Sequence, residues 1–345
     1  MLADARQTAR LALAFALLSL TLPHALAQRF SFVSTRVPDW YPSTHGRAPQ
    51  SEVFLYRDGS ELRLTHTSHA SEYDPAPSPG ARYVAFVAHD HSDEEGGWEA
   101  WSWYLGVVET LTGREVARWD LPGSVGMLRP AGGFQTAWAG AEAVLAQVPA
   151  ADGSWEVHRF DVATGEARSV ASGFGVALAR GGGRLATTRD DGVHVVDLAT
   201  GTDELVFAGA AGPLAWWRGG LLVANEAGLV LVDPTTGAAE EVQGPAGVVT
   251  EVRADPAGAA VAYVLLDPDA QSSEVVVIGD DGVASSVWYE PGWISGLDWL
   301  GDGLLAFAVD ELTGDTRVQV TDLSGQGFAV SSAGADHSPR GVPAR

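Results

Sequence analysis

The sequence predicts an all-β protein, a single β-propeller of four-stranded blades, and three observations support this prediction. Short apolar runs end in a turn centred on glycine seven times, at Gly59, Gly113, Gly165, Gly201, Gly237, Gly282 and Gly325. These turns recur every 36 to 54 residues, which is typical of a repeat architecture. Runs rich in β-branched residues flank the turns, and helical periodicity is almost absent beyond the N-terminal segment. We expect seven blades; six is the alternative, if one copy is degenerate.

Three of the glycine turns share one pattern: Asp161-Val-Ala-Thr-Gly165, Asp197-Leu-Ala-Thr-Gly201 and Asp233-Pro-Thr-Thr-Gly237. Aspartate and threonine side chains can bond to nearby backbone amides, and glycine tolerates the positive φ that such a turn needs. Each pattern therefore predicts a hairpin between the outer two strands of a blade. The aspartates have a structural role in this interpretation, and no catalysis is assigned to them.

Two further strands precede each hairpin, as in Leu214–Trp216 followed by Leu221–Ala224. The ends of the chain fit the same unit. The run that begins at Arg29 resembles the second strand that begins at Arg82, and the run Asp336–Arg340 resembles the inner strand Glu72–Ala76. We therefore expect the C-terminal strand to complete the blade that the N-terminal strand opens, which would remove exposed sheet edges.

Residues 1–27 have the features of a secretory signal peptide. Arg6 and Arg10 form a positive start, residues 11–22 are apolar and uncharged, and Ala25-Leu26-Ala27 is a small-x-small cleavage site. We expect cleavage near Ala27, a periplasmic or secreted protein, and a propeller domain over residues 28–345. The chain contains no cysteine, so it cannot form disulfides.

The charge balance is strongly acidic. The chain carries 44 Asp and Glu residues against 21 basic residues, all of them arginine, for a net charge of −23. Such a surface repels phosphate backbones and anionic lipid headgroups. We therefore expect no nucleic-acid partner and no membrane insertion, and we expect a monomer.

One repeat resembles a known family. The run Ser51–Thr65, followed by Glu72-Tyr-Asp-Pro-Ala-Pro-Ser-Pro-Gly80 and Val84-Ala-Phe86, is similar to the repeat of TolB-like (WD40-like) periplasmic β-propellers. Trp138, Trp216 and Trp299 lie near the tryptophan position of that repeat. The Ser-Pro-Asp-Gly element of the family is missing between residues 174 and 245. The resemblance covers the propeller portion of such proteins and implies an exported binding protein.

One predicted surface differs from the rest of the chain in its loops. Second-to-third-strand loops and blade-joining loops share one face of a propeller, and the loop over residues 89–100 is much longer than closure requires. Together with residues 66–74 it gathers histidines, carboxylates and tryptophans, which suit a cation or a docked peptide or sugar. The candidate partner-binding residues are His69, Glu72, Asp74, His89, Asp90, His91, Trp98, Trp101 and Trp103.

No catalytic constellation can be identified, and no Gly-x-Ser-x-Gly nucleophile motif is present. We therefore expect a non-enzymatic binding or scaffold module for a protein, peptide or cell-envelope component, without a cofactor. The alternative is a metal-dependent propeller enzyme of the sugar lyase or lactonase type. The candidate ligands for a divalent cation are His89, Asp90, His91 and Asp93, although their spacing matches no strong metal motif.

Overall fold

The computed structural model describes residues 29–34, 51–57, 60–67, 70–90, 102–121, 135–150, 152–226, 228–242, 247–301, 303–310, 316–330 and 336–342. The predicted signal peptide, residues 1–27, lies outside these ranges. So do Gly59 and five of the candidate site residues: His69, His91, Asp93, Trp98 and Trp101. None of the described segments forms a helix that is long and apolar enough to span a lipid bilayer.

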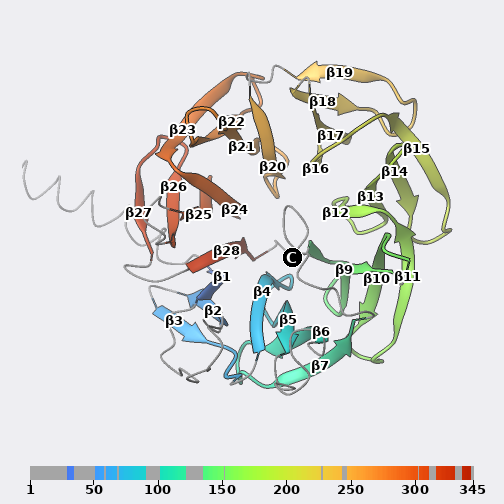
Figure 1. Cartoon of the computed structure of the whole chain (residues 1–345), viewed down its shortest axis with the longest axis vertical. Coiled ribbons are helices and arrows are strands. Elements are labelled where there is room, and N and C mark those ends of the chain that lie inside the picture. The colour runs from blue at the N-terminus through green and yellow to red at the C-terminus, as the bar shows by residue number, and fades with distance from the viewer. Residues whose placement is uncertain are drawn as a thin grey trace, which may run out of the picture.

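Seven four-stranded antiparallel sheets form a ring, which confirms the predicted seven-bladed propeller (Figure 1). We number the blades 1 to 7 from the blade that contains β1. Blade 1 consists of β28 (Asp336–Gly341), β1 (Arg29–Ser34), β2 (Glu52–Arg57) and β3 (Ser60–Arg63). Blade 2 consists of β4 (Ala70–Pro77), β5 (Tyr83–Asp90), β6 (Ser102–Glu109) and β7 (Glu115–Asp120). Blade 3 consists of β8 (Thr136–Trp138), β9 (Ala143–Pro149), β10 (Trp155–Asp161) and β11 (Ala167–Ser172).

The remaining four blades follow in chain order. Blade 4 consists of β12 (Phe174–Leu178), β13 (Arg184–Arg189), β14 (Gly192–Asp197) and β15 (Asp203–Ala208). Blade 5 consists of β16 (Leu214–Trp217), β17 (Gly220–Asn225), β18 (Gly228–Val232) and β19 (Ala239–Val242). Blade 6 consists of β20 (Val248–Ala254), β21 (Val261–Asp267), β22 (Ser272–Ile278) and β23 (Ala284–Pro291). Blade 7 consists of β24 (Trp293–Gly301), β25 (Leu304–Asp310), β26 (Thr316–Asp322) and β27 (Gly327–Ala329).

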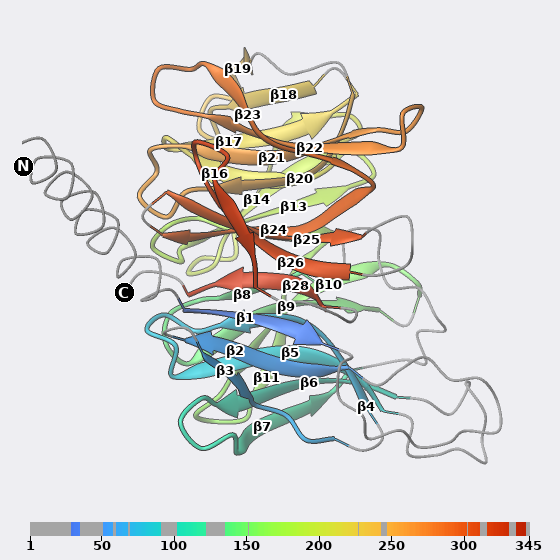
Figure 2. The same ribbon diagram turned by 90° about the vertical axis from the view of Figure 1, so that its left-hand side faces the viewer.

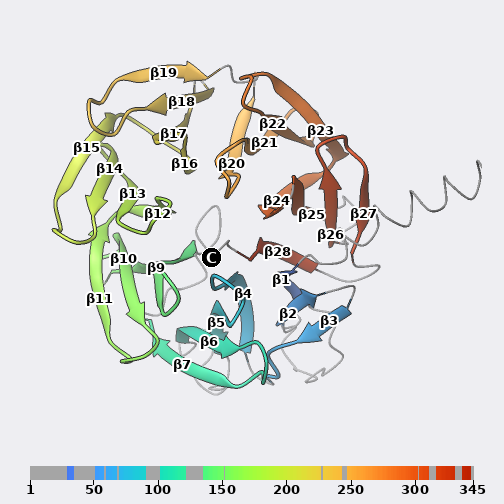
Figure 3. The same cartoon turned by 180° about the vertical axis from the view of Figure 1, so that it is seen from behind.

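The ring closes in blade 1 as the chain ends predict. β1 pairs with β2 on one side and with the C-terminal strand β28 on the other, so strands from both ends of the described chain share one sheet (Figure 2). Seen from behind, the first strand of each sheet faces the axis and the fourth lies at the perimeter (Figure 3). Because the ring is closed, every blade has a neighbouring blade on each side.

The predicted aspartate turns form as expected. The Asp161 Oδ1 atom accepts hydrogen bonds from the amides of Ala163 and Thr164, at 3.1 and 3.0 Å. Gly165, which closes this turn, has a φ of 75°, a conformation that favours glycine. Asp197 and Asp233 bond in the same way to the amides of their own turns. These hairpins join the third and fourth strands of blades 3, 4 and 5.

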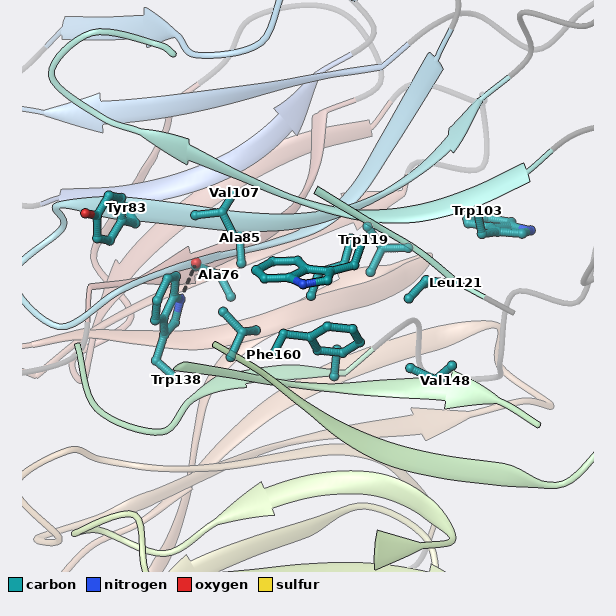
Figure 4. Packing of buried hydrophobic residues seen from close by; sticks show 14 residues of the cluster. Ala76, Tyr83, Ala85, Trp103, Val107, Trp119, Leu121, Trp138, Val148 and Phe160 are labelled. Carbon is teal, nitrogen blue, oxygen red and sulfur yellow. Dashed lines mark hydrogen bonds between the residues drawn. The ribbon is translucent and has the colours of Figure 1, made fainter. Parts of the chain in front are cut away.

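Apolar side chains from adjacent blades meet in the core. Between blades 2 and 3, for example, Trp119 packs on Phe160 with ring centroids 5.3 Å apart, and Tyr83 stacks on Trp138 at 6.2 Å (Figure 4). A four-stranded sheet has two faces to cover, and stacking in a ring covers both. The hydrophobic core therefore consists of the layers of side chains between adjacent blades, which we call seams. The side chains that face the axis are not part of these layers.

Candidate functional site: the axial funnel

The seven inner strands surround a cavity of about 1170 Å³, which we call the axial funnel. Every blade contributes to its lining, from Ala76 in blade 2 to Asp298 in blade 7 and Arg340 in blade 1. The lining also includes the hairpin tips at residues 139–141, 179–182, 218–219 and 255–258, which join first and second strands. The funnel therefore lies toward the face that carries these hairpins, which we call the turn face.

The charge of the funnel is opposite to that of the whole chain. Five arginines line it: Arg180, Arg184, Arg218, Arg253 and Arg340. Only two carboxylates, those of Asp255 and Asp298, are among the lining residues, whereas the chain as a whole has 44 acidic residues and a net charge of −23. The lining thus has an excess of three positive charges, which makes this cavity a locally basic site on an acidic protein.

Three of the arginines form the rim of the funnel. The Arg184 guanidinium lies over the Trp216 ring at 4.8 Å, and that of Arg218 lies over the Trp217 ring at 4.1 Å. Arg180 extends past blade 5 and donates from Nη1 to the Ala257 carbonyl of blade 6, at 3.3 Å. The ring contacts hold the guanidinium groups of Arg184 and Arg218 beside aromatic surface, and the hydrogen bond holds that of Arg180 beside blade 6.

The other two arginines lie deeper. Burial, followed by repulsion from Arg340, lowers the pKa of Arg253, while the carboxylates of Glu251, Asp298 and Asp74 oppose that shift. The Arg253 Nη2 atom is 3.7 Å from Glu251 Oε2, and about a fifth of its side chain remains exposed, at 21%. The deep layer therefore contains two like charges that repel each other, with neighbouring acids offsetting them in part.

Five of the residues predicted for the partner-binding surface lie in the described part of blade 2. They do not line the funnel, and four of them lie toward the opposite ends of the strands. His89 stacks on Trp103 with ring centroids 4.4 Å apart, and Trp103 is only 5% exposed because it packs in the seam between blades 2 and 3. Asp90 accepts a 3.0 Å hydrogen bond from Arg118, whose guanidinium lies 3.7 Å over the Tyr104 ring.

Glu72 has the most unusual environment of the predicted residues. It is fully buried, its Oε1 accepts a 2.6 Å hydrogen bond from Thr67, and its Oε2 finds no partner among the described residues. Burial and then repulsion from Glu52 raise the pKa of Glu72 well above its usual range. Glu52 itself is paired with Arg63 at 2.6 Å.

Asp74 comes closer to the axis than the other predicted residues. It adopts a φ of 48°, at a register shift in β4 between Tyr73 and Ala76, and its charge acts on Arg253. Within the described ranges, no three His, Asp or Glu side chains gather closely enough to hold a metal ion. The metal site and the predicted partner-binding surface remain predictions, since half of their residues lie outside those ranges.

The sequence analysis missed the five funnel arginines, although a signal was present for the two that lie in hairpins, Arg180 and Arg218. In blades 2 and 6 the hairpins after the inner strands read Ser78-Pro-Gly80 and Asp255-Pro-Ala-Gly258. In blades 4 and 5 the same hairpins read Ala179-Arg-Gly-Gly182 and Arg218-Gly219. The stretch without the Ser-Pro-Asp-Gly element is therefore where arginine enters the turns. Its departure from the repeat could have indicated a functional site.

Solved structures share this architecture. TolB from Acinetobacter baumannii superposes with a TM-score of 0.53 at 13% identity, over 91% of this chain and 66% of that one. The fold is that of a TolB-like propeller. A prolyl endopeptidase gives a TM-score of 0.60 at 16% identity, over 83% of this chain and 46% of that one. A puromycin hydrolase gives 0.51 at 16% identity, over 78% and 46%.

At these identities the likeness concerns the fold alone. The chain spans about two thirds of the length of the TolB chain and about half that of the two hydrolases. No protein-family model matches the sequence, and no curated protein does. The function must therefore be argued from the residues of the funnel.

Proposed function

We propose that this chain is an exported, non-enzymatic binding module that takes a polypeptide segment of a partner in its axial funnel. One observation carries the proposal: a single cavity of about 1170 Å³, lined by residues of all seven blades, at the axis of the ring. Pockets for small molecules usually measure about 300–1,000 Å³, so this volume favours a larger ligand. The TolB-like architecture supports a protein partner, and the signal-like residues 1–27 support export.

The lining suits a polypeptide chemically. Trp216 is half-buried and borders the funnel, where its ring can pack on side chains or on the backbone of a ligand. Trp138 and Trp217 also border the funnel but are largely buried, so they support its wall. Arginine and tryptophan are also the residue types most enriched among binding hot spots. The predicted surface on the opposite face, with Glu72, His89 and Trp103, is a second candidate for the contact.

Site-specific photo-crosslinking in the native host tests the proposal and separates the two faces. A benzoylphenylalanine residue is placed at Ala141 or Ala257 on the funnel rim, at His66 or Ser102 on the opposite face, and at Ala167 on an outer strand as the control. We expect one specific adduct from the rim positions alone. Adducts only from His66 or Ser102 would move the site to the predicted surface, and adducts from none of the positions would refute a binding role.

The alternative of a metal-dependent enzyme has its own test. Elemental analysis of the purified full chain is expected to find no stoichiometric divalent metal. A bound metal that is lost on His89→Ala would favour the enzyme and contradict the proposal of a non-enzymatic module.

A further inference from the structure

We propose that the ligand of the axial funnel is anionic, a short polypeptide segment rich in Asp and Glu whose carboxylates are bound by the funnel arginines. This inference rests on the proposed function and names the chemistry of the partner. It starts from the charge of the lining, which gathers five of the 21 arginines of the chain but only two of its 44 acidic residues. On an acidic protein, a cavity that concentrates arginine in this way attracts anions.

The rim arginines have free hydrogen-bonding capacity for such a ligand. Arg180 and Arg184 form no ion pair with any residue in the described part of the chain. Arg184 lies opposite Asp197 in the strand register, and its charge acts on that carboxylate without a close contact. Arg180 bonds to a carbonyl oxygen. Arg218 has one carboxylate contact, to Asp280 Oδ1 at 3.2 Å. A guanidinium has five donors in a planar fork, and two of them can donate parallel hydrogen bonds to one carboxylate. Each of these arginines can therefore bind a carboxylate of the ligand.

The deep pair adds an electrostatic reason. Arg253 and Arg340 both line the funnel, and burial followed by repulsion from Arg340 lowers the pKa of Arg253. Glu251 Oε2 is 3.7 Å from Arg253 Nη2, and the same carboxylate already accepts hydrogen bonds from the amides of Gly296 and Leu297, at 2.6 and 2.9 Å. The charges of Asp298 and Asp74 offset the repulsion only in part, since the pKa of Arg253 is still lowered. A carboxylate that enters between Arg253 and Arg340 would offset their repulsion, and in a site screened from water that effect is stronger than at the surface.

The basic lining of the funnel and the acidic exterior of the protein together favour a short anionic ligand. At physiological salt, charges separated by more than about 8 Å are largely screened, so a segment inside the funnel interacts mainly with the lining. A long polyanion such as nucleic acid would extend over the acidic exterior and be repelled there. The combination favours a few consecutive carboxylates on a flexible peptide.

The experiment uses the full chain and defined probes. Isothermal titration calorimetry compares an acetylated, amidated hexaglutamate with hexaglutamine and with inorganic phosphate. The test variant is Arg180→Ala/Arg184→Ala. The matched control is Arg114→Ala/Arg168→Ala, which removes the same charge from exposed positions away from the funnel. Thermal melting of both variants verifies that they are folded.

We expect hexaglutamate to bind, hexaglutamine not to bind, and the affinity to fall with added salt. Loss of charge-assisted hydrogen bonds predicts an affinity roughly tenfold or more lower in the test variant and unchanged in the control. Equal losses in both variants, or no binding of hexaglutamate, would overturn the inference. Phosphate binding without hexaglutamate binding would assign the arginines to phosphate and overturn it as well.

The two proposals fail in different ways. If the rim positions crosslink to a partner but hexaglutamate does not bind, the polypeptide-binding function stands and the acidic nature of the ligand is refuted. If hexaglutamate binds through Arg180 and Arg184 while no rim position crosslinks, the anion site stands and the polypeptide partner is refuted.

Discussion

Three tryptophans occupy the same place in their blades and link each blade to the one before it. The indole Nε1 of Trp138 donates to the Ala76 carbonyl at 2.7 Å, that of Trp216 to the Ala177 carbonyl at 2.8 Å, and that of Trp299 to the Arg253 carbonyl at 3.0 Å (Figure 4 shows the first). Each acceptor lies on the inner strand of the preceding blade. The repeated tryptophan therefore both fills a seam and satisfies a backbone carbonyl there.

Replacing Trp138 by phenylalanine tests this link. The ring remains apolar, but the buried Ala76 carbonyl loses its donor, so we expect the free energy of unfolding to fall by about 1–2 kcal/mol, plus a smaller packing term. Urea unfolding measures it. Trp293, which is 56% exposed, provides the control: Trp293→Phe should change stability little. Equal stability of the Trp138 variant and the parent would contradict a linking role.

Glu72 predicts a pH dependence of stability at the residue scale. Its pKa is raised above the ordinary value of 4.5 in the folded protein. At a pH between 4.5 and the folded pKa, the folded state therefore binds more protons than the unfolded state. Stability should therefore fall as pH rises from about 4.5 through the folded pKa, and the Glu72→Gln variant should lose this dependence and be more stable at pH 8.

Denaturant unfolding across the pH range measures the effect. Glu52→Gln is the comparison, and it also removes the charge that repels Glu72. Glu52 is equally buried, but it is paired with Arg63 and Thr65, both at 2.6 Å, so removing its charge should destabilise the protein. If Glu72→Gln is less stable than the parent at pH 8, the carboxylate has a partner that compensates its burial.

At the scale of elements, the inner strands are irregular, and side chains of the preceding blade support them. The register of β24 shifts between Ser295 and Asp298, and the Glu251 carboxylate of blade 6 bonds to two amides of that bulge. The same device recurs where Gln135 of blade 3 accepts the Val176 amide of blade 4 at 2.9 Å. A bulge leaves backbone amides without ladder partners, and a side-chain acceptor satisfies them.

Glu251→Ala should therefore destabilise blade 7 more than an ordinary surface change. It removes the acceptor of the Gly296 and Leu297 amides, and we expect a loss on the order of 3 kcal/mol, with Glu251→Gln intermediate. Hydrogen exchange should show faster exchange at those two amides first. Unchanged protection there would mean that another group satisfies the bulge.

Much of this element structure is readable from the sequence, because its signals are local. Gly165 and Asp197 belong to turns whose side chains bond within a few residues, so their conformation depends little on the rest of the molecule. The funnel arginines were not readable in the same way. Arg253 and Arg340 are 87 positions apart in the sequence, and only closure of the ring brings them to one cavity.

At the scale of the whole molecule, stability depends on the closing strand. Deleting residues 336–345 removes β28 and exposes the edge of β1, so we expect the melting temperature to fall by about 10 °C or more and aggregation to increase. Thermal unfolding followed by light scattering measures both. A shorter deletion, of residues 343–345 only, leaves β28 in place and serves as the control. A full deletion that melts like the parent would show that the ring does not need its closure.

The sheet of blade 1 also orders events during synthesis. A ribosome makes β28 after every other strand of the ring, yet β1, which it must pair with, is made first. Blades 2 to 7 can therefore form as their own strands emerge in the compartment where the chain folds, whereas blade 1 must wait with an open edge until Gly341 has emerged. The same strand carries Arg340. The funnel is therefore incomplete until β28 pairs with β1. The protein can bind its ligand only after the ring has closed.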